Sequence, residues 1–210
     1  MKRLVNILGS EVASDLGFLK ITKTRFTYTL PGGLREPNGT EPEQTRLVID
    51  RKNSAAALVR QKSTGLLYFV KQFRFATYNE ADEPSEENGW LTELVAGVVE
   101  SNETSREAIS REIGEELGFQ DLSSPELIGS FYLSPGAASE RLYLYFVEVG
   151  DVEPLASTLR RGDGDEWIQP ISMTPDDFLE RVAKVEIFDA KTVVCAEYVR
   201  RRPDLFRSPS

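Results

Sequence analysis

The sequence predicts an α+β fold in which helices sandwich a mixed β-sheet. Strand-like segments dominate the 210-residue chain, and only three segments carry the start and stop signals of helices. An apolar content of 40% and a charged content of 28% are normal for a soluble globular protein. This length suits one domain with a small extension, so we expect an N-terminal strand extension at 1–44 and the main domain at 45–210.

Strands dominate the N-terminal half. Residues 18–30 alternate in polarity, with Phe26 and Tyr28 on one face. The stretch 31–42 is rich in Pro and Gly and predicts a loop, and the acidic residues 79–89 predict a second one. The other strands expected here are 45–50, 55–61, 66–73 and 90–96.

Two helices are expected near the C-terminus. Thr174 followed by Pro175 predicts a helix start. Asp189 caps a last helix, which must end before Pro203. The strands expected before these helices are 126–133, 141–149 and 166–171.

The third helix lies within residues 97–119, GVVESNETSREAISREIGEELGF. Thr104 and Glu107 have the spacing of a capping box, and Gly118 provides the stop. One stripe of this helix must face a core, because apolar residues recur every four positions. These residues are Ile109, Ile113 and Leu117.

Three glutamates cluster on one side of the same helix, at positions i, i+3 and i+4: Glu112, Glu115 and Glu116. Their like charges repel one another. Arg111 can pair with Glu107 or Glu115, and it can also reach back to Glu103. The remaining negative charge calls for a cation, and carboxylate oxygens suit Mg²⁺ or Mn²⁺ better than zinc.

Composition excludes several functions. The chain has no histidine, which rules out Ser-His-Asp and Cys-His mechanisms and histidine-ligated zinc. A net charge of −9 argues against nucleic acid or an anionic membrane as partner. Cys195 is the single cysteine, which suits a reducing compartment. No segment approaches transmembrane length and the basic start is too short for a signal peptide, so a cytoplasmic protein is expected.

The segment 97–119 resembles the Nudix box, G-x5-E-x7-R-E-U-x-E-E-x-G-U, at every position. A solvated acidic helix face would explain E-x-x-E-E alone, but not the flanking identities. The resemblance implies an α/β/α sandwich around a mixed sheet and hydrolysis of a nucleoside diphosphate linked to another moiety. The matching identities are Gly97, Glu103, Arg111, Glu112, Glu115, Glu116 and Gly118.

By this resemblance, Glu112, Glu116 and the backbone carbonyl of Ala96 are expected to bind the metal, Mg²⁺ with Mn²⁺ as substitute. Glu115 would support the two ligands. Arg111, together with Glu103, would hold the loop and helix in shape.

Outside the box, residues 45–200 resemble the ADP-ribose and nucleotide-sugar pyrophosphatase branch. Pro135 stands at the branch's proline marker, sixteen residues beyond the box. Residues 70–77 and 189–193 are similar to GDP-mannose pyrophosphatases. Val95 stands where the branch often has proline, which loosens the ADP-ribose assignment.

Further site residues follow from this branch. Arg74 is expected to bind the diphosphate, because a guanidinium fork matches phosphate oxygens; an exposed surface arginine is the alternative. Glu93 would accept from a ribose or sugar hydroxyl, or else form a strand-end salt bridge. Glu166 aligns with a late carboxylate that acts as base or extra ligand, with Asp163 and Asp165 as runners-up and a polar turn as the alternative.

The branch is commonly dimeric, with N-terminal strands reaching the partner's nucleotide site. This makes Phe26 and Tyr28 candidates for base stacking, although the core face of a strand explains them equally well. The expected activity is Mg²⁺-dependent cleavage of ADP-ribose or a related nucleoside diphosphate sugar to a nucleoside monophosphate and a sugar phosphate. GDP-mannose pyrophosphatase is the alternative within this class. A non-catalytic nucleotide-sugar sensor is the alternative from another class, and such domains typically lose box glutamates.

Overall fold

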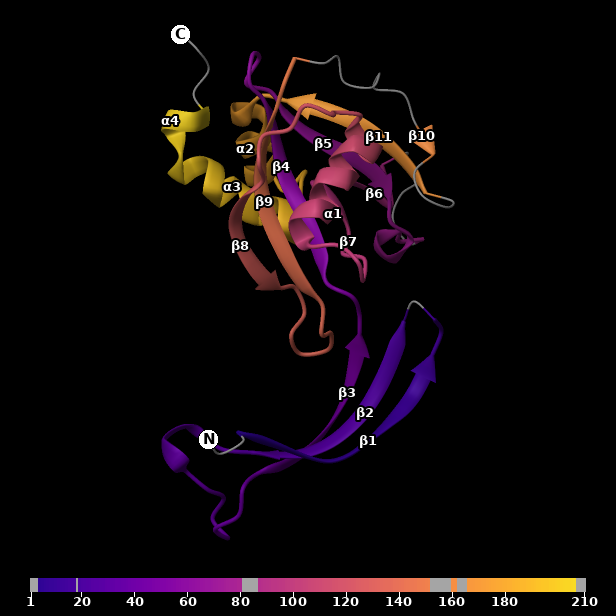
Figure 1. The fold of residues 1–210 in the computed structure, drawn as a ribbon, viewed down its shortest axis with the longest axis vertical. Helices are drawn as coiled ribbons and strands as arrows, with labels where there is room; N and C mark the ends of the chain where they lie inside the picture. Colours follow the sequence, from indigo (N-terminus) through magenta and orange to yellow (C-terminus); the bar gives the residue numbers. More distant parts are fainter. Residues whose placement is uncertain (1–3, 18, 81–86, 152–159, 162–165, 207–210) are drawn as a thin grey trace. The chain divides into compact units, whose positions relative to one another are not determined.

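The computed structural model describes residues 4–17, 19–80, 87–151, 160–161 and 166–206 (Figure 1). Its contacts divide the chain into two units. Unit 1 comprises Met1–Lys52 and Tyr132–Glu140, and unit 2 comprises Asn53–Phe131 and Arg141–Ser210. No helix among the described residues is long and apolar enough to cross a membrane.

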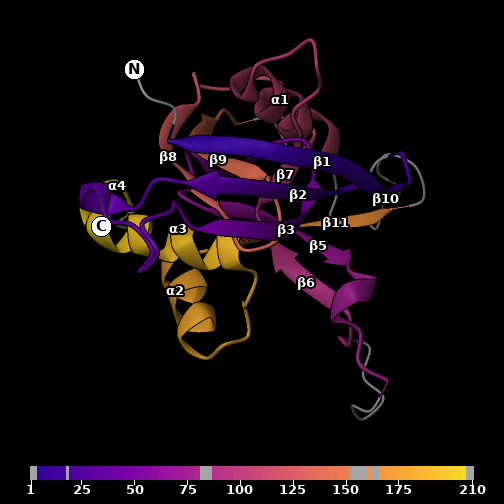
Figure 2. The same ribbon diagram turned by 90° about the horizontal axis from the view of Figure 1, so that it is seen from below.

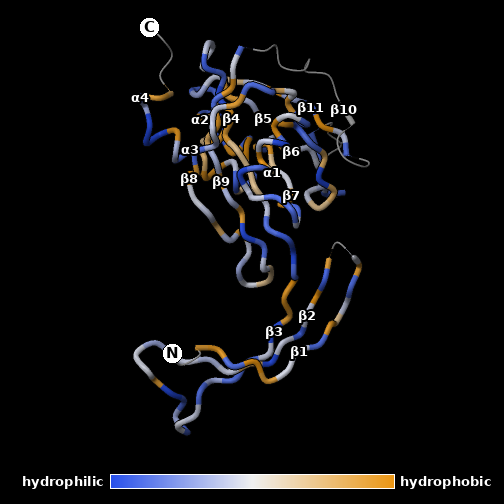
Figure 3. The backbone as a smooth tube through the Cα atoms, in the orientation of Figure 1, coloured by the Kyte–Doolittle hydropathy of each residue, from blue (hydrophilic) through white to orange (hydrophobic). Residues whose placement is uncertain are grey.

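Unit 1 is a three-stranded antiparallel sheet in the order β1-β2-β3. Its strands are β1 (Val5–Asp15), β2 (Lys20–Tyr28) and β3 (Glu43–Asp50). Apolar residues occur along all three strands (Figure 3), yet none of their described side chains is buried. The sheet therefore has no core of its own within the described residues.

Two features of unit 1 differ from the sequence expectation. We did not expect β1, whose pairing with β2 shifts register between Ile7 and Gly9 and again between Val12 and Ser14. Each irregularity breaks the two-residue alternation by which a strand is recognised. In addition, β3 pairs with β2, so this strand belongs with unit 1 although the expected extension ended at residue 44.

Unit 2 contains a mixed sheet in the order β10-β11-β5-β4-β9-β8. Among the described strands, β4 and β9 pair in parallel, whereas β10 with β11, β11 with β5, β4 with β5, β4 with β7 and β5 with β6 pair antiparallel. The strands are β4 (Ser54–Gln61), β5 (Leu67–Phe73), β6 (Trp90–Glu93), β7 (Val95–Val98), β8 (Glu126–Tyr132), β9 (Arg141–Val149), β10 (Arg160–Arg161) and β11 (Trp167–Met173).

The strand predicted at 90–96 is in fact two strands. β6 pairs with β5 and β7 pairs with β4, at positions where β4 and β5 do not pair with each other. The corner between them is the buried Leu94, whose backbone N–H donates to the side-chain oxygen of Thr192 at 2.9 Å. The sequence of this segment does not reveal such a change of partner, because the partner strands β5 and β4 lie elsewhere in the chain.

Both faces of this sheet carry a core. Alternate side chains of β4 enter separate clusters, with Ala57 and Val59 on one face and Ala56 and Leu58 on the other. The helix α1 (Ser105–Glu112) packs on the first face, and α2 (Pro175–Ala183), α3 (Ala190–Arg201) and α4 (Pro203–Phe206) pack on the second (Figure 2). The predicted α/β/α sandwich is confirmed.

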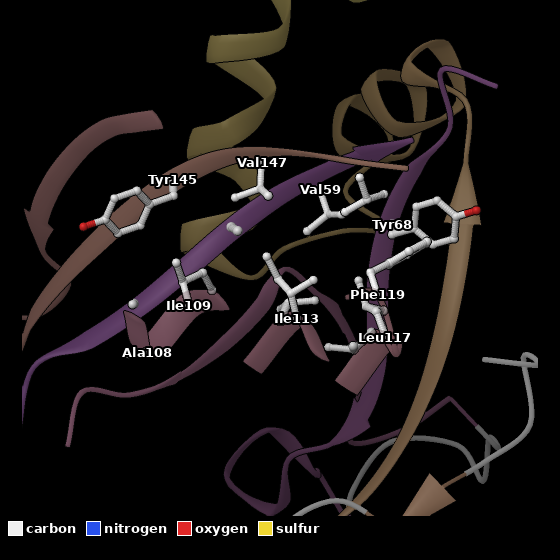
Figure 4. Packing of buried hydrophobic residues seen from close by; sticks show 14 of the residues in the cluster. Val59, Tyr68, Ala108, Ile109, Ile113, Leu117, Phe119, Tyr145 and Val147 are labelled. Atoms are coloured by element: carbon white, nitrogen blue, oxygen red, sulfur yellow. The ribbon is translucent and has the colours of Figure 1, made fainter. Parts of the chain in front are cut away.

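The box helix has the predicted boundaries. Thr104 and Glu107 form the capping box, and Gly118 ends the segment with a φ of 82°. The structure adds a π-helical turn, Ile113–Leu117, after α1. The predicted apolar stripe, Ile109, Ile113 and Leu117, points toward the sheet residues Val59 and Val147 (Figure 4).

Candidate active site

Arg111 lies at the centre of the acidic cluster on the box helix. Its Nε and Nη2 donate to the two carboxylate oxygens of Glu103, at 3.3 and 2.9 Å. Its Nη1 donates to Glu112 at 2.8 Å and to Glu115 at 2.9 Å. These bonds, first of all those with Glu103, raise the pKa of Arg111. The guanidinium thus ties the preceding loop to the helix and is fully engaged within the protein.

Gly97 allows one of these carboxylates to approach the sheet. A Cβ atom at Gly97 would lie 1.7 Å from Oε1 of Glu112, so a side chain there would force Glu112 to move. Gly97 belongs to β7 and follows Ala96, the residue whose carbonyl the resemblance assigns to the metal. The glycine therefore lets Glu112 lie against the strand that carries Ala96.

Glu116 is the least satisfied carboxylate of the cluster. It accepts a hydrogen bond from the backbone N–H of Ala96, but its Oε2 is buried and has no hydrogen-bond partner among the described residues. Burial, and next the charge of Glu112, raise the pKa of Glu116 to about 8. An ionised Glu116 is thus costly unless a cation compensates for it.

These residues fit a hard divalent cation. Within the described parts of the chain, no three acidic, cysteine or histidine side chains form a ready-made metal cage. Magnesium does not require one, because it is usually bound by one or two carboxylates and completes its shell with water and phosphate oxygens. Glu112 and Glu116, beside the backbone of Ala96, supply such a donor set.

A second charged cluster surrounds Arg74, which follows β5. Its Nε and Nη2 donate to the carboxylate of Glu93 at 2.7 and 3.3 Å. Glu93 is only 3% exposed and also accepts a short hydrogen bond from Nζ of Lys191. Burial opposes its charge, but the hydrogen bond from Arg74 and the charge of Lys191 outweigh burial and lower the pKa of Glu93. The structure therefore shows the salt-bridge alternative for Glu93.

Glu166 lies beside this second cluster. Its Oε2 accepts from Nε2 of Gln72 at 2.6 Å, and its Oε1 lies 3.6 Å from Nη1 of Arg74. Its charge also contributes to the raised pKa of Glu116. The side chain is 55% exposed, so it can reach solvent. The runners-up, Asp163 and Asp165, lie outside the described residues.

A family model of the NUDIX domain matches residues 50–193, which is more than half of the chain. This chain belongs to the Nudix family. The GDP-mannose pyrophosphatase of Yersinia pestis (strain Pestoides F) is 30% identical over 167 residues, covering 80% of each chain. The GDP-mannose pyrophosphatase of Salmonella paratyphi B (strain ATCC BAA-1250 / SPB7) is 29% identical over 200 residues, covering 95% of this chain and 97% of the relative.

The Nudix fold is also seen in a solved structure. The crystal structure of an ADP compounds hydrolase aligns with a TM-score of 0.66 at 15% sequence identity. The alignment covers 95% of this chain and 94% of that chain. At this identity the likeness concerns the fold, and it agrees with the α/β/α sandwich of unit 2.

In this Nudix protein, three of the predicted site residues belong to unit 1. The rings of Phe26 and Tyr28 on β2 lie 6.1 Å apart and are half-buried, and Nε2 of Gln44 donates to the hydroxyl of Tyr28 at 3.0 Å. Pro135 is exposed in the segment Tyr132–Glu140. The remaining predicted site residues all belong to unit 2.

Sequence analysis missed two residues that contact predicted site residues. Gln72 is a buried polar residue that holds Glu166, and Lys191 holds Glu93. Both occur in the segments that resemble GDP-mannose pyrophosphatases, so a signal was present. Their partners lie 94 and 98 positions away along the chain, and local spacing therefore could not assign these contacts.

Proposed function

We propose that this Nudix protein is a metal-dependent pyrophosphohydrolase of ADP-ribose or related nucleoside diphosphate sugars, releasing a nucleoside monophosphate and a sugar phosphate. One observation carries the proposal: two carboxylates suited to a cation, Glu112 and the unsatisfied Glu116, occur in the same unit as a guanidinium, Arg74, beside an accessible base, Glu166. The names of the relatives, GDP-mannose pyrophosphatases, agree with this substrate class.

Glu112, Glu116 and the carbonyl of Ala96 would hold Mg²⁺, for which Mn²⁺ would substitute. The bound ion would neutralise charge on the diphosphate oxygens and activate water. Arg74 would orient the diphosphate, because its fork-shaped donor set matches phosphate oxygens. Gln72 holds Oε2 of Glu166, which leaves Oε1 as the atom that accepts the proton of the attacking water.

A non-catalytic sensor is the competing function, and retention of all seven box identities argues against it. The deciding experiment incubates the protein with ADP-ribose or GDP-mannose, with Mg²⁺ and with a chelator, and follows the nucleoside monophosphate by chromatography. We expect release that depends on the metal. Binding of the nucleotide sugar without any release would identify a sensor instead.

The preferred substrate is determined by comparing several nucleotide sugars. Pro135 favours ADP-ribose, whereas the segments 70–77 and 189–193 and the names of the relatives favour GDP-mannose. We expect ADP-ribose to be cleaved best, with other nucleotide sugars within about a hundredfold, because stacking on an aromatic ring selects weakly. Values of kcat/KM for ADP-ribose, GDP-mannose, ADP-glucose and dinucleotide polyphosphates measure this. Exclusive cleavage of GDP-mannose would reverse the ranking.

We also propose a cytoplasmic homodimer without nucleic-acid or membrane partners. The single cysteine and the net charge of −9 support the compartment and the absence of these partners. Unit 1 supports the dimer, because Val5 and Ile7 are 50% and 66% exposed opposite Tyr28 and Phe26 on β2. Light scattering of wild type and of Ile7→Lys tests this arrangement. We expect a dimer that the substitution weakens, whereas a monomeric wild type would refute it.

A further inference from the structure

Among the described residues, Lys191 forms ion pairs with Glu93 and Asp189 and not with Arg74 or the acidic box residues, yet Glu93 links it to the proposed diphosphate site. We propose that Lys191 is a positioning residue that acts through Glu93 to set the orientation and the available charge of Arg74 for the substrate diphosphate. The inference rests on the proposed function, because it assumes that Arg74 binds this group. It assigns a role to the start of α3, a segment for which the Nudix box provides none.

Two adjacent residues of α3 contact the corner between β6 and β7. Lys191 is 11% exposed and donates to Oε2 of Glu93, while its Nζ also lies 3.1 Å from Oδ1 of Asp189. The neighbouring Thr192 accepts the backbone N–H of Leu94, the residue after Glu93, at 2.9 Å. Two contacts from adjacent α3 residues therefore fix two adjacent residues at the corner between β6 and β7. Glu93 cannot move away from this corner without breaking a buried ion pair.

Asp189 fixes the lysine from the other side. Its Oδ2 accepts the backbone N–H of Thr192 at 3.1 Å and the hydroxyl of Thr192 at 2.6 Å, as the N-cap of α3. Its other oxygen, Oδ1, is the one that lies beside Lys191. The ammonium group is thereby held between the helix cap and Glu93 and is not free to sample solvent.

The charges around Glu93 explain why the position of Lys191 matters for Arg74. Glu93 carries one negative charge and contacts two cations, Arg74 and Lys191. Asp189 beside Lys191 and Glu166 beside Arg74 add two carboxylates, so the cluster holds two positive and three negative charges, and Lys191 supplies half of its positive charge. Glu93 accepts hydrogen bonds from Nε and Nη2 of Arg74, whereas Nη1 of Arg74 lies 3.6 Å from Oε1 of Glu166. Without Lys191, Glu93 would pair with Arg74 alone, and the attraction of Arg74 for phosphate would fall.

A purely structural role is the alternative, because an unpaired buried carboxylate also destabilises a fold. The test therefore compares Lys191→Met and Lys191→Arg with Arg60→Met. Arg60 forms a partly buried ion pair with Glu148 in the same unit, at 2.8 Å, and neither residue belongs to the Arg74 cluster. Both Met variants take one cation away from a glutamate of unit 2, so Arg60→Met controls for the general cost of losing an ion pair.

Affinity for ADP-ribose and GDP-mannose is measured by calorimetry in chelator, and kcat and KM are measured with Mg²⁺. For Lys191→Met we expect Kd and KM to rise about tenfold, because the loss of one hydrogen bond to a charged group typically changes an equilibrium constant by about that factor or more. We expect kcat to change much less. Lys191→Arg should recover most of the affinity, and Arg60→Met should not alter it. An unchanged Kd in Lys191→Met, with the same loss of thermal stability as in Arg60→Met, would show a structural role only.

Two further measurements separate this inference from the proposed function. In an Arg74→Gln background, Lys191→Met should have no further effect on Kd, and additive effects would overturn the inference. The NMR signal of the Arg74 Nε–H group reports its bond to Glu93 without any substrate. We expect it to shift in Lys191→Met, and an unchanged signal refutes the inference. If it shifts while wild type cleaves no nucleotide sugar, the proposed function fails and the positioning role stands.

Discussion

Arg111 and Arg74 both contact glutamates in unit 2, but the two guanidinium groups differ in how their nitrogens are bonded. Arg111 donates to the carboxylates of Glu103, Glu112 and Glu115, so carboxylates outnumber the guanidinium. Arg74 shares one buried carboxylate with a second cation, Lys191, and approaches Glu166 only at 3.6 Å. All three side-chain nitrogens of Arg111 donate within the protein, whereas Nη1 of Arg74 lies 3.6 Å from Glu166, and we propose that this nitrogen meets the ligand.

The same comparison applies to the carboxylates. Glu103 and Glu115 have their charge compensated by Arg111, whereas Glu116 is buried beside Glu112 with an unsatisfied oxygen. The acidic cluster therefore divides into carboxylates that pair with Arg111 and a carboxylate whose charge calls for a cation. The partners of each side chain, and not its charge alone, indicate which of these roles it has.

The strongest test of this division is Glu116→Gln. We expect kcat to fall roughly 10³-fold or more, because a group that helps to stabilise transition-state charge is lost. The fold should persist, and thermal stability in chelator at pH 7 should hardly change, because the raised pKa of about 8 already keeps most of the Glu116 carboxyl neutral and the amide has a similar shape. Kinetics, Mg²⁺ titration and thermal denaturation measure these effects.

Glu115→Gln is the matched control for that experiment. Glu115 is 49% exposed and pairs with Arg111, so we expect a much smaller loss of kcat. Equal losses in the two variants would contradict the division. Near wild-type turnover of Glu116→Gln would remove this residue from the metal site altogether.

The next effect concerns the base. Glu166→Gln should lower kcat by about 10²–10⁴-fold with little change in KM, because a general base acts mainly in the transition state. Gln72 can still hold the amide oxygen, so the loop position should be retained. Steady-state kinetics with saturating Mg²⁺ provides the measurement. A larger loss in Asp163→Asn or Asp165→Asn would show that the base lies one to three residues earlier.

The two arginines can be compared directly by Lys substitution. Arg74→Lys should raise KM about tenfold and hardly alter thermal stability, because a lysine keeps the charge but loses the bidentate geometry. Arg111→Lys should instead lower thermal stability together with kcat, because an ammonium group cannot bridge Glu103, Glu112 and Glu115 at once. If both variants changed KM alone, the distinction between Arg111 as a structural residue and Arg74 as a ligand-binding residue would be wrong.

Local features of the acidic region could be predicted from sequence. The capping box at Thr104, the stop at Gly118 and the partners Glu103 and Glu115 of Arg111 all depend on spacing within one loop and helix. Helix geometry alone brings such residues together. The Nudix box is informative for the same reason, since it is a local constellation.

The Arg74 region could be predicted only in part. Its contacts join residues far apart in sequence, such as Gln72 with Glu166 and Lys191 with Glu93, 94 and 98 positions apart. The corner at Leu94 was also missed, because a change of strand partner leaves no mark in the apolar pattern. Long-range pairing is what brings this half of the site together, and one sequence does not contain that register explicitly.

The smallest expected effect concerns the start of α1. Thr104→Ala removes the side chain that accepts the backbone N–H of Glu107, which should cost about 1 kcal/mol of stability, as is typical for an N-cap. Thr174→Ala is the matched control, because Thr174 caps α2 on the opposite face of the sheet by accepting from Asp177. Denaturant unfolding of the two variants should give similar losses.

Activity then distinguishes two ways of anchoring α1. If Arg111 holds the loop to the helix through Glu103, the Thr104 cap is a second anchor, and its loss should leave kcat within about twofold of wild type. If instead the cap positions the helix, kcat should fall in Thr104→Ala and not in Thr174→Ala. Such a fall would mean that Arg111 is less decisive than its hydrogen bonds indicate. The loss expected of Arg111→Lys should then shrink accordingly, because the two anchors share the same task.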